Sequence, residues 1–182
     1  MDFKELITKR QSVRRYIDKP VEAEKIKTLI EAVRLAPSAC NSQPWTLIFV
    51  DEPDLKDKVA RATFNKTVAF NRFAVEAPVL AVLVIEKAKL VARIGGSIKN
   101  REFPLIDIGI AAEHFCLQAA ALGLGTCMIG WFNEKKIKRI LNIPDKKRVG
   151  LVITLGYAPD DYRFREKVRK PVGEMSRFNS YK

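Results

Sequence analysis

The sequence predicts a single α+β domain in which helices and strands form layers. Three observations support this prediction. The chain has 182 residues and 47% hydrophobic content, which is enough for one sizeable core. Two helical patterns precede the first strand pattern, which argues against strict βαβ repetition. Helices and strands are mixed along the rest of the chain, and crossovers through helices imply some parallel pairing. We therefore expect residues 1–182 to fold as one domain.

The N-terminal segment is expected to form two amphipathic helices. In the first, Asp2 can cap the start, and four residues fall on helical spacing: Phe3, Leu6, Ile7 and Arg10. A basic cluster then lies in a loop. After Pro20, apolar residues repeat at intervals of three and four over residues 26–36, which predicts a second helix that stops at Pro37.

Four buried strands are expected, over Trp45–Val50, Val79–Ile85, 126–131 and 149–155. A helix should begin at Asp51, before Pro53, and a basic helix capped by Asn133 should reach about residue 141. Residues 104–122 are apolar almost all round and precede Gly123, which predicts a long, central, buried helix. We expect residues 87–103 to form a mobile lid and the tail over 160–182 to reach outward.

Composition excludes several classes of protein. The run of apolar residues over 77–85 is far shorter than the roughly 20 residues that span a membrane, and the N-terminus lacks the apolar run of an export signal. The cysteines Cys40, Cys116 and Cys127 lack CxxC spacing, which favours reduced thiols in the cytoplasm. The single histidine, His114, is expected to pack on a helix face, and no metal site is expected.

The charge is the compositional outlier, with 33 Lys and Arg against 21 Asp and Glu, a net charge of +12. It is weighted toward the C-terminal part. Nucleic acid, nucleotide phosphates or a solubilising surface would each account for it, and the charge alone does not choose between them.

Two loops carry the side chains best suited to a ligand. In the loop after the first helix, Arg10, Ser12 and Arg14 alternate, so two guanidiniums and a hydroxyl can face one phosphate. A solvated basic turn is the alternative. Residues 36–45 crowd donors and acceptors before a strand, a density that suits the ribityl hydroxyls and ring edge of a flavin. The alternative there is a polar turn that satisfies its own backbone.

These two segments, in this order, resemble the nitroreductase family of FMN-dependent oxidoreductases, and the resemblance continues along the chain. An RRSxRxF-like element of the family is matched by Lys9, Arg10, Ser12, Arg14 and Tyr16. The further matches are APSxxNxQPW at 36–45, GLGTxxIG at 123–130, LxIP at 141–144, LGY at 155–157 and RxP at 169–171.

The resemblance implies an α+β sandwich with a mixed, mainly antiparallel sheet flanked by helices. It also implies a homodimer with shared FMN sites, in which the C-terminal tail wraps the partner subunit. The helix over 104–122 would lie at the dimer interface. The FMN-binding residues would be Arg10, Gln11, Ser12, Arg14, Pro37, Ser38, Ala39, Asn41, Gln43, Asn71, Ile129, Gly130, Trp131, Lys167 and Arg169.

Their roles follow from the same resemblance. Arg10 and Ser12 would bind the phosphate, Lys167 and Arg169 would close on it from the tail, and Arg14 would approach the N1/O2 edge of the ring. Pro37, Ser38 and Asn41 would come from the second subunit, while backbone amides at Gly130 and Trp131 would lie by N5. The chain departs from the family at Ala39, where a second serine is common. It also departs at Gly130 and Trp131, where some members carry an acidic residue. Trp131 and Phe132 could wall the substrate pocket or pack in the core.

The implied activity is transfer of hydride from NAD(P)H through flavin N5 to a nitroaromatic, a quinone or a similar small oxidant. No protein group acts as a nucleophile, and Arg14 tunes the flavin. Because GxGxxG is absent, NAD(P)H should visit transiently as a co-substrate. A flavin-dependent dehydrogenase, a dehalogenating enzyme or a flavin-fragmenting enzyme is the first alternative. A basic nucleic-acid-binding module is the second, although nothing resembles a recognition helix or an RNP motif.

Overall fold

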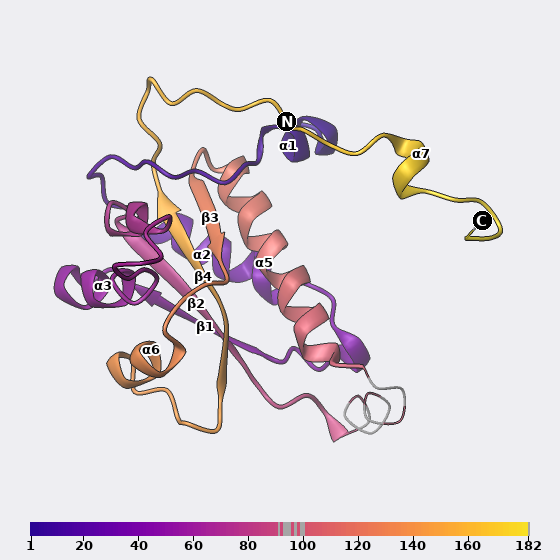
Figure 1. The fold of residues 1–182 in the computed structure, drawn as a ribbon, viewed down its shortest axis with the longest axis horizontal. Helices are drawn as coiled ribbons and strands as arrows, with labels where there is room; N and C mark the ends of the chain where they lie inside the picture. The colour runs from indigo at the N-terminus through magenta and orange to yellow at the C-terminus, as the bar shows by residue number, and fades with distance from the viewer. Residues whose placement is uncertain (91, 93–95, 97, 99–100, 182) are drawn as a thin grey trace.

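A four-stranded sheet forms the centre of the molecule in the computed structural model, which describes residues 1–90, 92, 96, 98 and 101–181 (Figure 1). The strands are β1 (Trp45–Val50), β2 (Val79–Ile85), β3 (Gly125–Ile129) and β4 (Arg148–Gly156), in the order β1-β2-β4-β3. All three pairings between them are antiparallel. Ser12 and Thr126 form an isolated parallel bridge outside these strands. The predicted α+β fold with a mainly antiparallel sheet is thus confirmed, whereas the parallel pairing expected from crossovers through helices is not found among the described strands.

Helices cover both faces of this sheet, which gives three layers (Figure 1). Helices α2 (Ala23–Arg34) and α5 (Phe103–Ala121) pack on one face. The other face is covered by α3 (Pro53–Ala60), the 3₁₀ turn η2 (Arg72–Val75) and α6 (Glu134–Ile140). Side chains of β2 alternate between the two cores, as the period of two in a strand requires: Leu80, Val82 and Val84 lie on the α3 side, and Val79, Ala81 and Leu83 on the α5 side.

The long helix α5 is buried along much of its length, as its apolar sequence predicts. Phe115 is fully buried, whereas Leu105 and Ile106 near its start are exposed. Gly123, with φ of +76°, follows the helix in the left-handed conformation that glycine adopts without strain. The prediction over residues 104–122 is thus correct to within one residue at each end.

The two chain ends project from this core. In α1 (Phe3–Lys9), Asp2 and Glu5 form the reciprocal contacts of a capping box, so Asp2 is the predicted cap. No residue of α1 is buried, and Phe3 is 68% exposed. The tail leads through the short helix α7 (Val172–Met175) away from the sheet (Figure 1). This last part therefore reaches outward as expected, whereas residues 161–167 pack back against the loop after α1. The wrapping of a partner subunit by the tail stays a prediction.

Three predicted boundaries are wrong. Helix α2 ends at Arg34, before the predicted stop at Pro37. Helix α3 is capped by Glu52 and not by Asp51, because Pro53 occupies the first helical turn and the Glu52 carboxylate accepts from the free backbone N–H groups of Asp54 and Leu55. Strand β3 ends at Ile129 instead of residue 131. The chain leaves β4 there and turns toward α3, where the Asn133 amide donates to the Ala62 carbonyl at 2.7 Å.

The lid predicted over residues 87–103 falls partly outside the described residues, since 91, 93–95, 97, 99 and 100 are not among them, and it stays a prediction. None of the described helices is both long enough and apolar enough to cross a membrane.

Candidate functional site

The basic loop after α1 is fixed on the sheet by Val13. The Val13 amide donates to the Thr126 carbonyl at 2.8 Å, and the Val13 side chain is buried. Gly125 leaves room for it, because a Cβ at that position would lie 2.8 Å from the Val13 Cβ. The Tyr16 hydroxyl donates to the Val13 carbonyl at 2.8 Å and lies 2.6 Å from Thr154 Oγ1. Burial raises the pKa of Tyr16 well above its usual value, so this phenol stays neutral.

The C-terminal tail returns to this loop and brings cations to it. The Lys167 ammonium donates to the Arg10 carbonyl, and the Arg165 amide donates to Gln11 Oε1 at 3.2 Å. The Arg165 guanidinium also donates to the Ser12 carbonyl at 3.1 Å. The structure therefore places the predicted residues Arg10, Gln11, Ser12 and Lys167 together, although more than 150 positions separate the two segments in the sequence.

Positive charge is concentrated around Arg10 and Lys167, and Glu113 is the one acid that pairs with either of them among the described residues. Burial is the main cause of a lowered pKa at Lys167, and the charges of Arg10 and Arg169 lower it further, while Glu113 opposes them. Glu113 is the ion-pair partner of Arg10, with Arg10 Nε 3.1 Å from Glu113 Oε1. The side-chain amide nitrogen of Gln11 is buried and has no hydrogen-bond partner. An anion such as a phosphate would pair with the cations Arg10 and Lys167 and would accept a hydrogen bond from the Gln11 amide.

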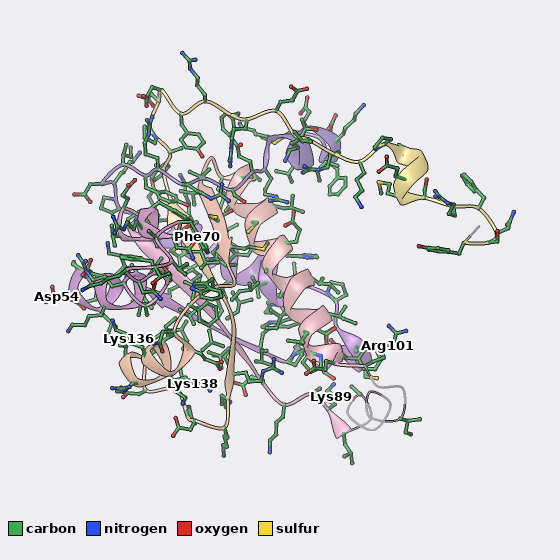
Figure 2. All side chains as sticks on the ribbon, in the orientation of Figure 1. Asp54, Phe70, Lys89, Arg101, Lys136 and Lys138 are labelled. Atoms are coloured by element: carbon green, nitrogen blue, oxygen red, sulfur yellow. The ribbon has the colours of Figure 1, made fainter. Side chains whose placement is uncertain are left out.

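A cavity of about 340 Å³ opens at the end of β3. Its lining residues are Arg14, Phe70, Asn71, Cys127, Met128, Ile129, Gly130 and Trp131. Figure 2 shows Phe70 between α3 and β3, and this ring is 66% exposed. The predicted residues Arg14, Asn71, Ile129, Gly130 and Trp131 therefore share one cavity. Burial raises the pKa of Cys127 in its wall, although the charge of Arg14 opposes the effect, so the thiol is neutral.

Asn71 holds the walls of this cavity together. It is 6% exposed, and its side-chain nitrogen donates to the Thr63 carbonyl at 3.1 Å and to the Trp131 carbonyl at 3.2 Å. These two bonds use both protons of the amide. Asn71 thus ties the loop after β3 to the segment after α3. Of the adjacent aromatics, Trp131 is 57% exposed and lines the cavity, whereas Phe132 packs against the core. A role of Trp131 in a substrate pocket stays a prediction.

The polar loop over residues 36–45 lies elsewhere in the chain. Its 3₁₀ turn η1 (Ala39–Asn41) packs near the start of α5, where the Ala39 amide donates to Asp107 Oδ1 at 3.0 Å, while Arg10 and Gly125 lie toward the other end of this helix (Figure 1). Pro37, Ser38, Asn41 and Gln43 accordingly make no contact with Arg14 among the described residues. The Arg169 guanidinium donates to the Val168 carbonyl, and its charge acts on Lys167, the residue with which it was predicted to close on a phosphate.

This loop is internally bonded and strained. Ser38 Oγ accepts from the Gln43 amide at 2.8 Å, and Asn41 Oδ1 accepts from the Gln43 side chain at 2.9 Å. Cys40, Asn41 and Gln43 all have positive φ, between 48° and 52°, without being glycine. Such backbone is costly and persists where the surrounding structure holds it. The loop is thus built to present side chains in one conformation.

Sequence reasoning missed three residues that shape these sites: Asp107, Tyr162 and Arg165. Asp107 is 2% exposed, and a buried position for one of only two acids in the otherwise apolar sequence of α5 was a readable signal. The Tyr162 hydroxyl accepts from the Arg14 amide at 3.2 Å. Nothing local distinguishes Tyr162 or Arg165 from their polar neighbours. His114 behaves as predicted, half-buried on α5 with Nδ1 3.0 Å from the Ile110 carbonyl oxygen. The described residues contain no cluster of three potential metal ligands.

Comparison with known proteins decides the family. The model of the nitroreductase family matches residues 7–157. The chain belongs to the nitroreductase family. A crystal structure of a nitroreductase family protein from Clostridium novyi NT is 36% identical, covers 88% of this chain and 87% of its own, and superposes with a TM-score of 0.77. This confirms the fold.

Two further relatives have more specific names. A protein of Archaeoglobus fulgidus, provisionally named NADH dehydrogenase/NAD(P)H nitroreductase, is 31% identical, with 88% of each chain covered. A structure titled FMN-dependent nitroreductase, from Clostridium difficile R20291, is 27% identical, covers 97% of this chain and 98% of its own, and has a TM-score of 0.79. Lys167 and Arg169 lie beyond the segment that the family model matches.

Proposed function

We propose that this nitroreductase-family protein is an FMN-dependent oxidoreductase that takes hydride from NAD(P)H and delivers the electrons to a small oxidant such as a nitroaromatic or a quinone. The names of the Archaeoglobus and Clostridium difficile relatives support the two cofactors. The observation that carries the proposal is the cluster of Arg10, Gln11 and Lys167, in which two cations lie close to a buried side-chain amide that has no hydrogen-bond partner.

The donor set fits the phosphate end of FMN. A phosphate brings negative charge and several acceptor oxygens, which suit the guanidinium of Arg10, the ammonium of Lys167 and the free amide of Gln11. Binding it would relieve the mutual repulsion that contributes to the lowered pKa of Lys167. Ser12 lies between this cluster and Arg14, and its hydroxyl is the further donor in the loop.

The cavity at the end of β3 fits the ring end. Arg14 lies four residues from Arg10, a reach of at most about 14 Å in extended chain, so one elongated ligand can touch both. FMN, when bound there, supplies an acceptor of hydride and a donor of two electrons. Arg14 contributes positive charge that favours a reduced, negatively charged ring edge. Asn71 orients the backbone of Gly130 and Trp131 toward the cavity.

The site is completed by a second subunit in this proposal. Pro37, Ser38, Ala39, Asn41 and Gln43 lie too far along α5 to serve the Arg14 cavity of their own chain, so they serve that of the partner. Large apolar side chains on both projecting ends support a dimer: Met1, Phe3, Val168, Val172, Met175, Phe178 and Tyr181 are all exposed. Such surface is characteristic of an interface.

The overall reaction needs no protein nucleophile. One NAD(P)H and one proton reduce a quinone to its hydroquinone, with NAD(P)⁺ as the other product, and both reactants use the same cavity in turn. The exposed Trp131 and Phe70 at its mouth offer aromatic surface against which flat substrates can pack.

The test is reduction of FMN-loaded protein by NADPH and NADH without oxygen, followed through the visible flavin absorbance. The proposal expects rapid bleaching, and recovery of the absorbance when a quinone is added. Protein that carries FMN but is bleached by neither nucleotide would refute the proposed electron donor. It would favour a flavin-dependent dehydrogenase or another flavin chemistry of the family.

A further inference from the structure

A basic hollow of about 470 Å³ lies beside the Arg14 cavity, and Arg14 is the one residue of its lining that the proposed FMN site uses. It is lined by Arg14, Arg15, Asp161, Tyr162, Arg163 and Arg165. Arg14 lines both spaces, so the hollow continues from the mouth of the proposed flavin site. The cations proposed for the FMN phosphate, Arg10 and Lys167, do not line it.

The charges of the hollow are unbalanced. Its lining holds four guanidiniums and one carboxylate, and that carboxylate, Asp161, is already ion-paired with Arg15. Arg14, Arg163 and Arg165 have no carboxylate partner among the residues that the structure describes. Unpaired guanidiniums that share one hollow with no acid to neutralise them favour an anion.

Three of the four arginines are held by neighbouring groups, and the fourth is free. The Tyr162 hydroxyl accepts from the Arg14 backbone amide, and the guanidinium carbon of Arg15 lies 6.0 Å from the centre of the Tyr162 ring. Arg165 donates to the Ser12 carbonyl. Arg163 is exposed and makes no hydrogen bond or ion pair to another described residue, so its guanidinium is free to meet a ligand.

We propose that this hollow binds the 2′-phosphate of NADPH and so makes the enzyme prefer NADPH over NADH. Arginine guanidiniums match a phosphate monoester with paired N–H donors, and NADH has no phosphate at that position. The inference rests on the proposed function in one respect: the nicotinamide enters the cavity at the end of β3, and the adenosine end of the same molecule lies over the hollow. The proposal thus assigns a specific ligand to a part of the chain's excess positive charge that the FMN phosphate does not use.

The experiment uses Arg163→Ala and Arg163→Glu in the full-length protein. Both are compared with Arg139→Ala, which removes an exposed arginine of α6 that has no ion-pair partner among the described residues and lies outside this hollow. We expect kcat/KM for NADPH to fall by about tenfold in Arg163→Ala and further in Arg163→Glu, which places a like charge beside the phosphate. The value for NADH should stay within about twofold of wild type, and Arg139→Ala should match wild type with both nucleotides.

A binding measurement that needs no turnover accompanies the kinetics. Calorimetric titration with 2′,5′-ADP and with 5′-AMP compares the same nucleoside with and without the 2′-phosphate. We expect 2′,5′-ADP to bind wild type more tightly than 5′-AMP, and Arg163→Ala to remove most of that difference. Raised ionic strength should also reduce the difference, because the hollow is open to solvent.

Several results would overturn the inference. Equal losses with NADPH and NADH, or no loss with either, would show that the hollow does not recognise the 2′-phosphate. Loss of bound FMN from Arg163→Ala would assign the hollow to the phosphate of the flavin. Salt-sensitive DNA binding that Arg163→Glu abolishes, with nucleotide binding unchanged, would assign it to nucleic acid. Wild-type protein that is reduced equally well by both nucleotides would refute this inference and leave the proposed function standing.

Discussion

Substitution of Gly125 by alanine tests whether the contact between the basic loop and β3 positions the candidate site. The new Cβ would lie 2.8 Å from Val13 Cβ and 2.8 and 2.9 Å from its two Cγ atoms, whereas ordinary contact begins at 3.4 Å. A rotation of the Val13 side chain cannot relieve this, because its Cβ is fixed by the backbone. The loop must therefore shift by about 0.6 Å, the difference between 3.4 and 2.8 Å, and weaken the hydrogen bond from Val13 to Thr126.

Overpacking of this kind costs about 1–3 kcal/mol, and the entropy that alanine removes from the unfolded chain offsets up to about 1 kcal/mol. We expect the free energy of unfolding of Gly125→Ala to fall by about 1–2 kcal/mol, measured by urea unfolding. FMN should bind about tenfold more weakly, because Arg10 and Arg14 lie on the displaced segment. Quenching of flavin fluorescence measures that affinity.

The controls separate this contact from a general effect of alanine. Gly173→Ala should leave both quantities unchanged, since a Cβ there meets nothing within 4 Å. Val13→Gly removes all three clashing atoms. The double variant with Gly125→Ala should therefore lose less free energy of unfolding than the two single variants lose together. Wild-type stability and FMN affinity in Gly125→Ala, or strict additivity in the double variant, would refute the reasoning.

Three further changes test other parts of the structure. Arg14→Ala should weaken FMN retention or lower the reduction potential of bound FMN, and a redox titration with both quantities unchanged would remove Arg14 from its proposed role. Asn71→Asp loses both donors and turns a carboxylate toward carbonyl oxygens, so the free energy of unfolding should fall by about 1–3 kcal/mol and the fluorescence anisotropy of Trp131 should decrease; an unchanged anisotropy would contradict the tie between the loops. The Tyr157 hydroxyl is the main cause that lowers the pKa of Glu22 to about 2. Because this folded-state pKa lies below the ordinary value of 4.5, the stabilisation is complete above that value and is lost as the pH falls toward about 2. Tyr157→Phe should raise the pKa of Glu22 in an NMR titration, and an unaltered pKa would exclude the hydroxyl as its cause.

Local patterns predicted the elements of the fold well, since each depends on residues near one another in the chain. The uniformly apolar run Val79–Ile85 is a central strand covered on both faces, and Asp2 caps α1 as expected. The cap of α3 was misplaced by one residue, because Asp51 and Glu52 both have carboxylates and Pro53 decides between them.

The site was less accessible to sequence reasoning, because its geometry depends on contacts between distant segments. The pairing of Gly125 with Val13, and the two bonds by which Asn71 joins its neighbouring loops, leave no local pattern. The left-handed backbone at Cys40 and Gln43 occurs without glycine, so no composition signal marked it. Which residues meet FMN was therefore predicted from family motifs, while the way they are held required the structure.

The proposed FMN site is tested most directly by the flavin content and molar mass of the purified full-length protein. Flavin released on denaturation is quantified against protein, and light scattering after size-exclusion chromatography gives the mass. We expect a yellow dimer that releases FMN at about one molecule per chain. Protein that is colourless as purified, and that stays colourless after incubation with FMN, would contradict this expectation.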